Sequence, residues 1–164
     1  SQEYDIGLAE TPTPRSSIKI ETFDLECVIA LPEIDPLAQK DVLTPTDLRD
    51  YPMAMLFGDH HVTVATQAAF ASCDAALNRR FVLRTFLPSL QLAGAGLCGA
   101  VVDRITAATS PAPGVVFRKF APAITSSVSL LLPAHRPTSV LTNAFRIHLR
   151  EQLAQIDGIY ASKY

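Results

Sequence analysis

Alternating strand and helix patterns in the middle of the chain constrain its fold more than any other feature of the sequence. Short apolar runs of the kind that form strands buried on both faces are separated by segments with helical spacing. In order, the predicted elements are a strand at 53–57, a helix at 62–73, a strand at 80–84, a helix that Thr85 caps with Pro88 in its first turn, and a strand at 98–103. Strands that alternate with helices form parallel sheets with right-handed crossovers. The middle of the chain is therefore predicted to be a βαβαβ unit of an α/β fold.

Strands are also predicted on both sides of this unit, and we expect them to form a second sheet. The flanking elements are a short buried strand at 4–9, a long strand at 18–31, a helix that begins with a capping box at Thr44-Pro45-Thr46-Asp47, strands at 115–120 and 127–132, and a last helix opened by Pro137. The chain would cross between the sheets near 43–51 and again near 104–114. This places 1–45 in a partial first lobe, 46–108 in a second lobe, and 109–164 in the return strands and terminal helix of the first lobe. Two lobes joined by two crossings form a hinged cleft.

The composition indicates a globular domain and excludes some functions. Of the 164 residues, 48% are hydrophobic and 18% are charged, which is unlike a disordered tail. The net charge of −2 comes without a basic stripe, and the densest basic group, Arg79, Arg80 and Arg84, lies in a predicted strand. A domain that binds DNA through its phosphates needs clustered cations. This chain by itself is therefore not expected to bind DNA.

Apolar segments and cysteines bear on the cellular compartment. The longest near-apolar stretch, 92–102, is interrupted by glycines and is too short to span a bilayer, so no membrane partner is expected. The first residues show no basic flank followed by an apolar run, so no signal peptide is predicted. Cys27, Cys73 and Cys98 are widely spaced in apolar sequence, which is typical of buried, reduced structural thiols. These features favour a cytoplasmic protein.

The carboxyl ends of parallel strands are where an open α/β sheet binds its ligands. The first such end supplies Gly58, Asp59, His60, His61 and Thr63 as candidate ligand-binding residues. A helix that starts here would offer unpaired backbone N–H groups and a positive dipole end to a ligand carboxylate, and the histidines would add donors. The alternative is a glycine turn with Asp59 as the helix N-cap and two solvated histidines. Adjacent histidines lack the spacing of a metal site, so no metal is expected.

The other strand ends supply Thr85 with Phe86, Asp103 and, in the other predicted lobe, Glu10. Thr85 is expected to cap the following helix, and its hydroxyl would also face a ligand. Asp103 would either hold a ligand ammonium group or cap the turn at Arg104. Glu10 has the same two possible roles, as a ligand contact or as a cap. If both carboxylates face the cleft, the pocket suits a cationic amine.

Catalytic motifs are missing from the sequence. It contains no G-x-S-x-G elbow, P-loop or H-E-x-x-H motif. Cys73 and Cys98 would act as nucleophiles only beside a histidine, and nothing in the sequence places one there. We therefore predict no catalytic residue, no cofactor and no enzymatic activity.

Several motifs, taken in order along the chain, resemble the effector-binding domain of LysR-type transcriptional regulators. Tyr4-Asp5-Ile6-Gly7-Leu8 resembles a strand motif of the family, and Asp35-Pro36-Leu37-Ala38 resembles its HPL turn, with Asp35 in place of the usual histidine. The segment 43–48 resembles the crossover, 92–102 the Gly-rich helix-to-strand signature, and 128–136 with the closing helix the return strand and terminal helix. The branch that the chain resembles contains the lysine-biosynthesis activator LysR and the opine-responsive regulators.

The resemblance implies two Rossmann-like lobes of the periplasmic-binding-protein type (type II). It also implies an inducer of the amino acid, diaminopimelate or opine type, bound between the lobes, that changes how a homodimer or tetramer sits on DNA. Thr85 and the loop at 58–63 match positions where family members contact inducers. The DNA-binding winged helix and the first β-α-β stretch of the first lobe have no counterpart in this sequence. The first lobe is thus expected to be incomplete, and DNA to be contacted only through a missing N-terminal domain.

Two other functions share this architecture. A solute-binding protein for uptake of an amino-acid-like ligand uses the same two lobes, and a signal peptide upstream would favour it. An α/β enzyme is the second alternative, because a fold alone does not exclude catalysis. The leading prediction remains an effector-sensing domain that controls DNA binding and transcription.

Overall fold

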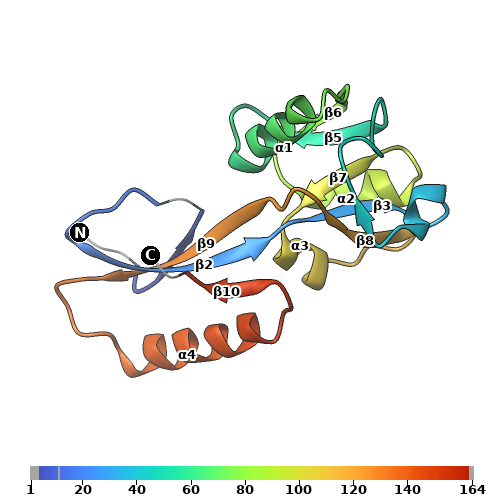
Figure 1. The fold of residues 1–164 in the computed structure, drawn as a ribbon. Helices are drawn as coiled ribbons and strands as arrows, with labels where there is room; N and C mark the ends of the chain where they lie inside the picture. Colours follow the sequence, from blue (N-terminus) through green and yellow to red (C-terminus); the bar gives the residue numbers. More distant parts are fainter. Residues whose placement is uncertain (1–3, 11, 163–164) are drawn as a thin grey trace. The chain divides into compact units, whose positions relative to one another are not determined.

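The computed structural model describes residues 4–10 and 12–162 and divides the chain into two compact units (Figure 1). The first unit comprises Ser1–Leu25 and Ser126–Tyr164, and the second comprises Glu26–Thr125. Among the described residues, no helix is both long enough and apolar enough to cross a membrane.

A six-stranded mixed sheet forms the second unit. Its strands, in spatial order, are β4 (Val42–Leu43), β8 (Val115–Phe120), β3 (Val28–Pro32), β7 (Gly99–Val102), β5 (Pro52–Leu56) and β6 (Asn78–Leu83). β5 pairs in parallel with both β6 and β7. The helices α1 (His61–Ser72) and α2 (Leu87–Gly94) connect these three strands. The predicted βαβαβ unit is confirmed.

The apolar runs of the sequence form the core of this unit. Every residue of β3 and β7 is buried, and so is every residue of β5 after Pro52. Burial on both faces explains why these strands read as continuous apolar runs and not as alternating ones. Large side chains that are fully buried here include Phe70, Ile29, Leu31, Leu43, Leu48, Met53 and Leu90. The second unit therefore has a hydrophobic core of its own.

The structure corrects the predicted lobe boundaries, because the predicted strand at 18–31 breaks at Cys27. β2 (Ile18–Glu26) and β3 follow each other in the chain but belong to different sheets. β3 pairs with β7 on one side and with β8 on the other, so segments assigned to the first lobe belong to the second unit. The chain passes between the units at 25–26 and at 125–126, and not at the two predicted crossings.

The segment from Thr44 to Asp47 makes the predicted capping bonds but starts no helix. The Asp47 carboxylate accepts hydrogen bonds from Thr44 N and from Thr44 Oγ1, both at 2.9 Å. The chain then turns back, because Tyr51 N donates to Leu48 O at 3.0 Å and Asp50 has a φ of 59°. The predicted helix is wrong here, and the segment is a run of turns that leads into β5.

Two short helices complete the second unit, the 3₁₀ helix η1 (Pro36–Gln39) and α3 (Arg104–Thr109). Asp35 caps η1 by accepting a hydrogen bond from Leu37 N at 2.9 Å. The same carboxylate accepts a hydrogen bond from the Tyr51 hydroxyl at 2.6 Å. Burial, together with this carboxylate, raises the pKa of Tyr51 well above its ordinary value. Asp35 thereby ties the HPL-like turn to the start of β5.

A four-stranded sheet and one helix form the first unit. The strand order is β1 (Gly7–Ala9), β9 (Thr125–Pro133), β2 and β10 (Ile159–Ala161), and the helix is α4 (Val140–Ala154). The helix begins after Ser139, whose side chain accepts a hydrogen bond from Thr142 N at 3.1 Å, and not at Pro137 as predicted. The predicted buried strand at 4–9 is the shorter edge strand β1, in which Leu8 is 58% exposed.

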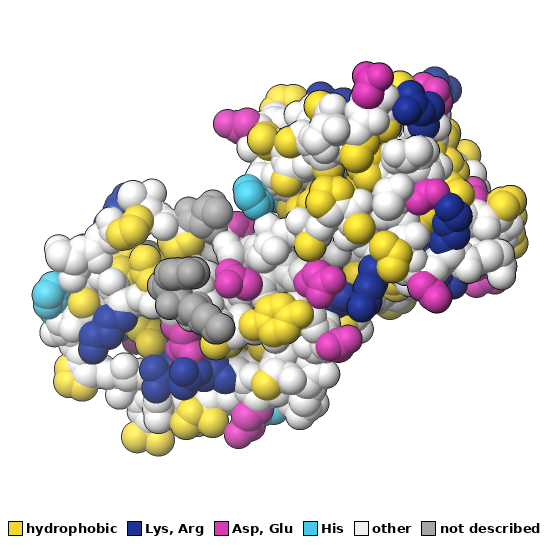
Figure 2. Space-filling view, viewed as in Figure 1, with side chains coloured by type: hydrophobic (Ala, Val, Ile, Leu, Met, Phe, Trp, Pro, Cys, Tyr) yellow, Lys and Arg dark blue, Asp and Glu magenta, His cyan; other side chains and the backbone are white. Residues whose placement is uncertain are grey.

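One end of α4 packs against the sheet and the other remains exposed. An ion pair joins Arg150 of α4 to Glu21 of β2. The buried apolar side chains of this unit are Phe23, Leu25, Leu130, Leu132, Leu153 and Ile159. At the start of the helix, by contrast, Val140 is 89% exposed and Leu141 is 80% exposed. Figure 2 shows hydrophobic side chains at the surface along the lower edge of this unit, where α4 lies.

The three cysteines are free, but they do not share one environment. Cys27 and Cys98 are buried, as predicted, and Cys73 is exposed, contrary to the prediction. Burial raises the pKa of the Cys98 thiol from 9.0 to about 11, so this thiol stays protonated at neutral pH. Within the described ranges, no group of three or more His, Cys, Asp or Glu side chains is arranged to hold a metal ion.

Candidate effector-binding site

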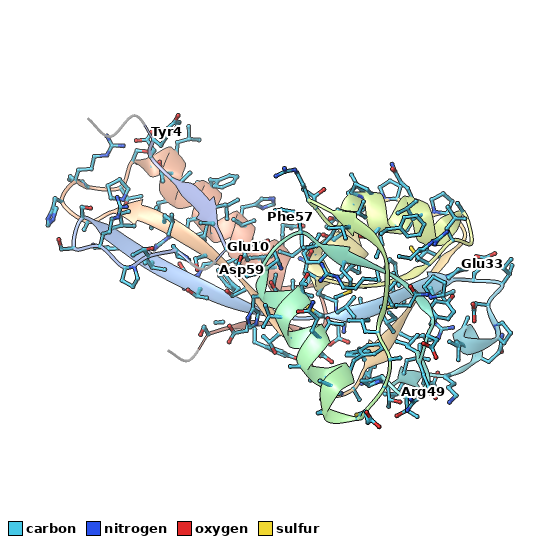
Figure 3. The ribbon with its side chains drawn as sticks, turned by 90° about the horizontal axis from the view of Figure 1, so that it is seen from above. Tyr4, Glu10, Glu33, Arg49, Phe57 and Asp59 are labelled. Atoms are coloured by element: carbon cyan, nitrogen blue, oxygen red, sulfur yellow. The ribbon has the colours of Figure 1, made fainter. Side chains whose placement is uncertain are left out.

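The strand ends that the sequence singled out lie at one edge of the second unit's sheet. β5, β6 and β7 run in parallel, so their carboxyl ends share that edge. We call the residues that follow these ends, 57–61, 84–86 and Asp103, the carboxyl edge. Phe57 N donates to Leu83 O at 2.7 Å, which extends the pairing of β5 and β6 up to this edge. Figure 3 shows Phe57 and Asp59 at the end of β5, just before α1.

Two side-chain contacts join the loop after β5 to the loop after β6. The His60 ring stands edge-on to the Phe86 ring, with 5.6 Å between the ring centroids and an interplanar angle of 88°. The Arg84 guanidinium carbon lies 5.4 Å from the centroid of the Phe57 ring. Edge-to-face aromatic pairs and cation–π contacts each contribute about 1 kcal/mol. Thr85 lies between the two contacting residues of its loop and is exposed.

The turn before α1 differs from the prediction in its capping residue. Gly58 has a φ of 72°, and a Cβ added there would meet no atom within 4 Å, so this position requires glycine for its backbone conformation only. The N-cap of α1 is His60 and not Asp59, because His60 Nδ1 accepts a hydrogen bond from Val62 N at 3.2 Å. As an acceptor, Nδ1 carries no proton. The Asp59 side chain is exposed and does not cap the helix.

His61 and Thr63 are used within the fold. His61 Nε2 lies 2.8 Å from Thr125 O, so this nitrogen donates its proton to the carbonyl at the start of β9. Thr63 is 1% exposed, and its hydroxyl donates to Leu56 O at 2.9 Å. This bond ties α1 to the end of β5 and leaves the Thr63 side chain almost no surface to offer a ligand.

Thr85 does not cap α2, in contrast to the prediction. The N-cap position falls on Phe86, which makes no side-chain cap hydrogen bond and is 8% exposed. The Thr85 hydroxyl is thus not required by the helix. Phe86 instead supports the loop from the core side through its contact with His60.

Asp103 serves as a helix cap, which is one of the two predicted roles. Its carboxylate accepts a hydrogen bond from Thr106 N at 2.9 Å and another from Thr106 Oγ1. The residue is 8% exposed and both of its carboxylate oxygens are used. The carboxyl edge therefore does not present this carboxylate to a ligand ammonium group. Glu10, the other predicted carboxylate, is exposed and follows β1 in the first unit.

Comparison with known proteins places the chain in a family. The model of the LysR substrate binding domain matches residues 1–154. The chain belongs to this family.

Curated relatives of this LysR substrate-binding domain are regulators. The chain is 32% identical over 167 residues to the transcriptional activator protein LysR of Escherichia coli (strain K12), covering 95% of this chain and 50% of that protein. It is 28% identical over 153 residues to the regulatory protein NocR of Agrobacterium tumefaciens (strain T37), covering 93% of this chain and 51% of that protein. The chain thus spans about half the length of the curated relatives it matches.

Solved structures confirm the predicted fold class. The regulatory domain of CcmR from Synechocystis PCC6803, in complex with 2-PG, superposes with a TM-score of 0.70 at 20% identity, over 92% of this chain and 74% of that one. The effector-binding domain of QuiR in complex with shikimate superposes with a TM-score of 0.67 at 15% identity, over 94% of this chain and 75% of that one. The fold is that of LysR-type regulatory domains, which is periplasmic-binding-protein-like of type II.

Two residues of the carboxyl edge were missed in the sequence. The sequence predicts Phe57 as the last residue of a buried strand, yet its side chain is 64% exposed. The sequence pattern places Arg84 only in a basic group within a predicted strand. Its position directly after β6, one residue before Thr85, was the available signal.

Proposed function

We propose that this domain is the effector-sensing part of a LysR-type transcriptional regulator and that it binds a small amino-acid-like inducer. The observation that carries the proposal is the family match over residues 1–154, together with two linked loops at the carboxyl edge of a parallel sheet. Ligands of open α/β sheets bind at this kind of edge. Enzymatic activity is not part of the proposal, because the curated relatives are regulators.

The carboxyl edge contributes to the site in two ways. Gly58, Asp59, His60 and Thr85 form the surface that faces the inducer, because they are exposed or half-buried and sit on the linked loops. Phe86, Thr63 and Asp103 hold this surface in place through their buried contacts. A rigid set of donors and acceptors binds a small polar ligand with little cost in lost flexibility.

The two compact units act as the two lobes in this proposal. An inducer that prefers one arrangement of the lobes shifts the population toward it, and the shift changes how a homodimer or tetramer engages DNA. DNA is contacted by an N-terminal domain of the longer protein, in the cytoplasm. The resemblance to the LysR and opine branch favours lysine, diaminopimelate or an opine as the inducer.

Isothermal titration calorimetry on the full-length regulator tests the proposal. We expect L-lysine, meso-diaminopimelate or an opine to bind, and Thr85→Val to weaken binding about tenfold, because a ligand hydrogen bond is lost. Thr46→Val is the matched control, since Thr46 is an exposed threonine in the turn at the amino end of β5. Lack of binding by all three ligand types, or equal losses in both variants, would contradict the proposal.

A further inference from the structure

An arginine at the carboxyl edge lies over an aromatic ring and forms no ion pair with any acidic residue that the structure describes. Arg84 follows β6 directly, and its guanidinium lies over the ring of Phe57, which follows β5 directly. Both side chains are exposed. Arg84 makes no hydrogen bond or ion pair with any residue in the part of the chain that the structure describes.

Other arginines of the chain have different surroundings. Arg104, Arg136 and Arg150 form ion pairs with Glu26, Asp5 and Glu21. Arg118 donates hydrogen bonds to backbone carbonyls, including Ala38 O at 2.9 Å. Arg84 differs from these because a ring fixes its position while its N–H groups stay available. Arg79 and Arg80 are also exposed, but they lie within β6, away from its carboxyl end.

Positive charge from Arg84 and from the N-terminus of α1 favours an anion at this edge, where Asp59 supplies an exposed negative charge just before the helix. The Asp103 carboxylate accepts its hydrogen bonds from Thr106 and, among the described residues, forms no ion pair with Arg84. The adjacent helix α1 has 12 residues, and its N-terminus carries a partial positive charge. The exposed ring of Phe57 adds an apolar surface beside the cation. A carboxylate joined to an aliphatic chain satisfies both features, because the guanidinium fork pairs with the carboxylate and the ring covers the chain.

We propose that Arg84, held by Phe57, binds a carboxylate of the inducer, so that the inducer is a carboxylic acid and not a simple amine. This inference rests on the proposed function and names the ligand class of the same site. It agrees with the ligand carboxylate that the sequence predicts at the start of the helix after β5, and it differs from the cationic amine that would be expected if Asp103 and Glu10 both faced the cleft.

Three probes that differ mainly in carboxylates test this inference on the full-length regulator. They are meso-diaminopimelate with two carboxylates, L-lysine with one, and cadaverine, the decarboxylated form of lysine, with none. We expect calorimetry to give tighter binding for the two acids than for cadaverine. Arg84→Gln should weaken binding of the acids about tenfold or more, because a charge-assisted pair is lost, and should leave cadaverine unchanged. Arg84→Lys keeps the positive charge but lacks the guanidinium fork. Its affinity for the acids should therefore lie between that of the unaltered protein and that of Arg84→Gln.

Arg80→Gln is the matched control, since it removes an exposed arginine from β6, the strand that Arg84 directly follows. Circular dichroism melts should show every variant folded, with Arg84→Gln lower by a few degrees at most, because only the contact with Phe57 is lost. Equal affinities of Arg84→Gln and Arg80→Gln for L-lysine would overturn the role of Arg84 and leave the proposed function standing. Cadaverine binding as tightly as lysine to the unaltered protein would also overturn it. Binding of none of the probes would overturn the lysine-like inducer itself, and this inference with it.

Discussion

The two units of the chain bury their apolar residues in different ways. In the second unit, Ile29 and Leu31 of the central strand β3 are 0% exposed, with neighbouring strands on both sides. In the first unit, one helix packs against a four-stranded sheet, and Leu141 of that helix is 80% exposed. The hydrophobic core cluster, from Cys27 to Ile124, lies entirely in the second unit. The difference indicates that the unit with the denser core also carries the candidate recognition edge, because a rigid scaffold keeps binding loops in place.

The largest expected effect contrasts a buried leucine of the second unit with an exposed leucine of the first. Leu31→Ala should lower the free energy of unfolding by about 3 kcal/mol, because it leaves a cavity in a core that cannot collapse. Leu141→Ala should change it by less than about 0.5 kcal/mol, because the side chain is already in water. Urea unfolding followed by circular dichroism measures both. Similar losses from the two variants would break the comparison.

Two glycines of the second unit sharpen the comparison within that unit. A Cβ at Gly94 would lie 2.5 Å from Pro113 O, a backbone atom that cannot move aside without shifting the chain. Gly94→Ala should therefore cost about 2 kcal/mol. Gly58→Ala meets no atom within 4 Å and should cost only about 1 kcal/mol, from its φ of 72°. Thermal unfolding ranks the two, and a larger loss from Gly58→Ala would contradict the account.

Alkaline pH should weaken the second unit through its buried thiol. The pKa of Cys98 is raised from 9.0 to about 11 in the folded protein. Stability is therefore complete below pH 9, where both states hold the proton, and falls between pH 9 and about 11 as the unfolded state alone releases it. The loss should be roughly 1–2 kcal/mol. Urea titrations at pH 9 and pH 11 measure this loss, and Cys98→Ala should reduce it. An equal loss in Cys98→Ala would contradict the assignment to this thiol.

The smallest effect concerns thiol accessibility without any change of stability. Cys73 is exposed, whereas Cys27 and Cys98 are buried. A thiol reagent such as dithionitrobenzoate should modify Cys73 rapidly in the folded protein, and the other two only after unfolding. Cys73→Ser should remove the rapid phase. A rapid phase that survives this substitution would show that the second unit opens readily.

The sequence predicted those features that depend on local pattern. The apolar runs at β5 and β7 predicted strands buried on both faces, and these strands are buried. The same runs predicted the βαβαβ unit and the edge at which its strands end. What the pattern left open was pairing between distant segments. β3 continues the alternation of β2, and only its pairing with β7 and β8 assigns it to the second unit.

For the loops of the candidate site, the sequence predicted where they lie more accurately than which of their residues cap the helices. The strand ends located the loops correctly. Asp59 and Thr85 were predicted as the N-caps of the two helices, but the N-cap residues are His60 and Phe86. A cap depends on the backbone angles of a turn, and residue type alone does not fix those angles. The contact between Arg84 and Phe57 was missed because it joins two loops whose distance no single segment of sequence encodes.

Hydrogen–deuterium exchange of the full-length regulator, with and without saturating L-lysine or meso-diaminopimelate, tests the central claim most directly. If the carboxyl edge recognises the inducer, amide exchange should slow in the peptides that contain 57–61 and 84–86, and should stay unchanged in the turn at 45–50. Slower exchange confined to that turn, or unchanged exchange across the second unit despite bound ligand, would contradict the account.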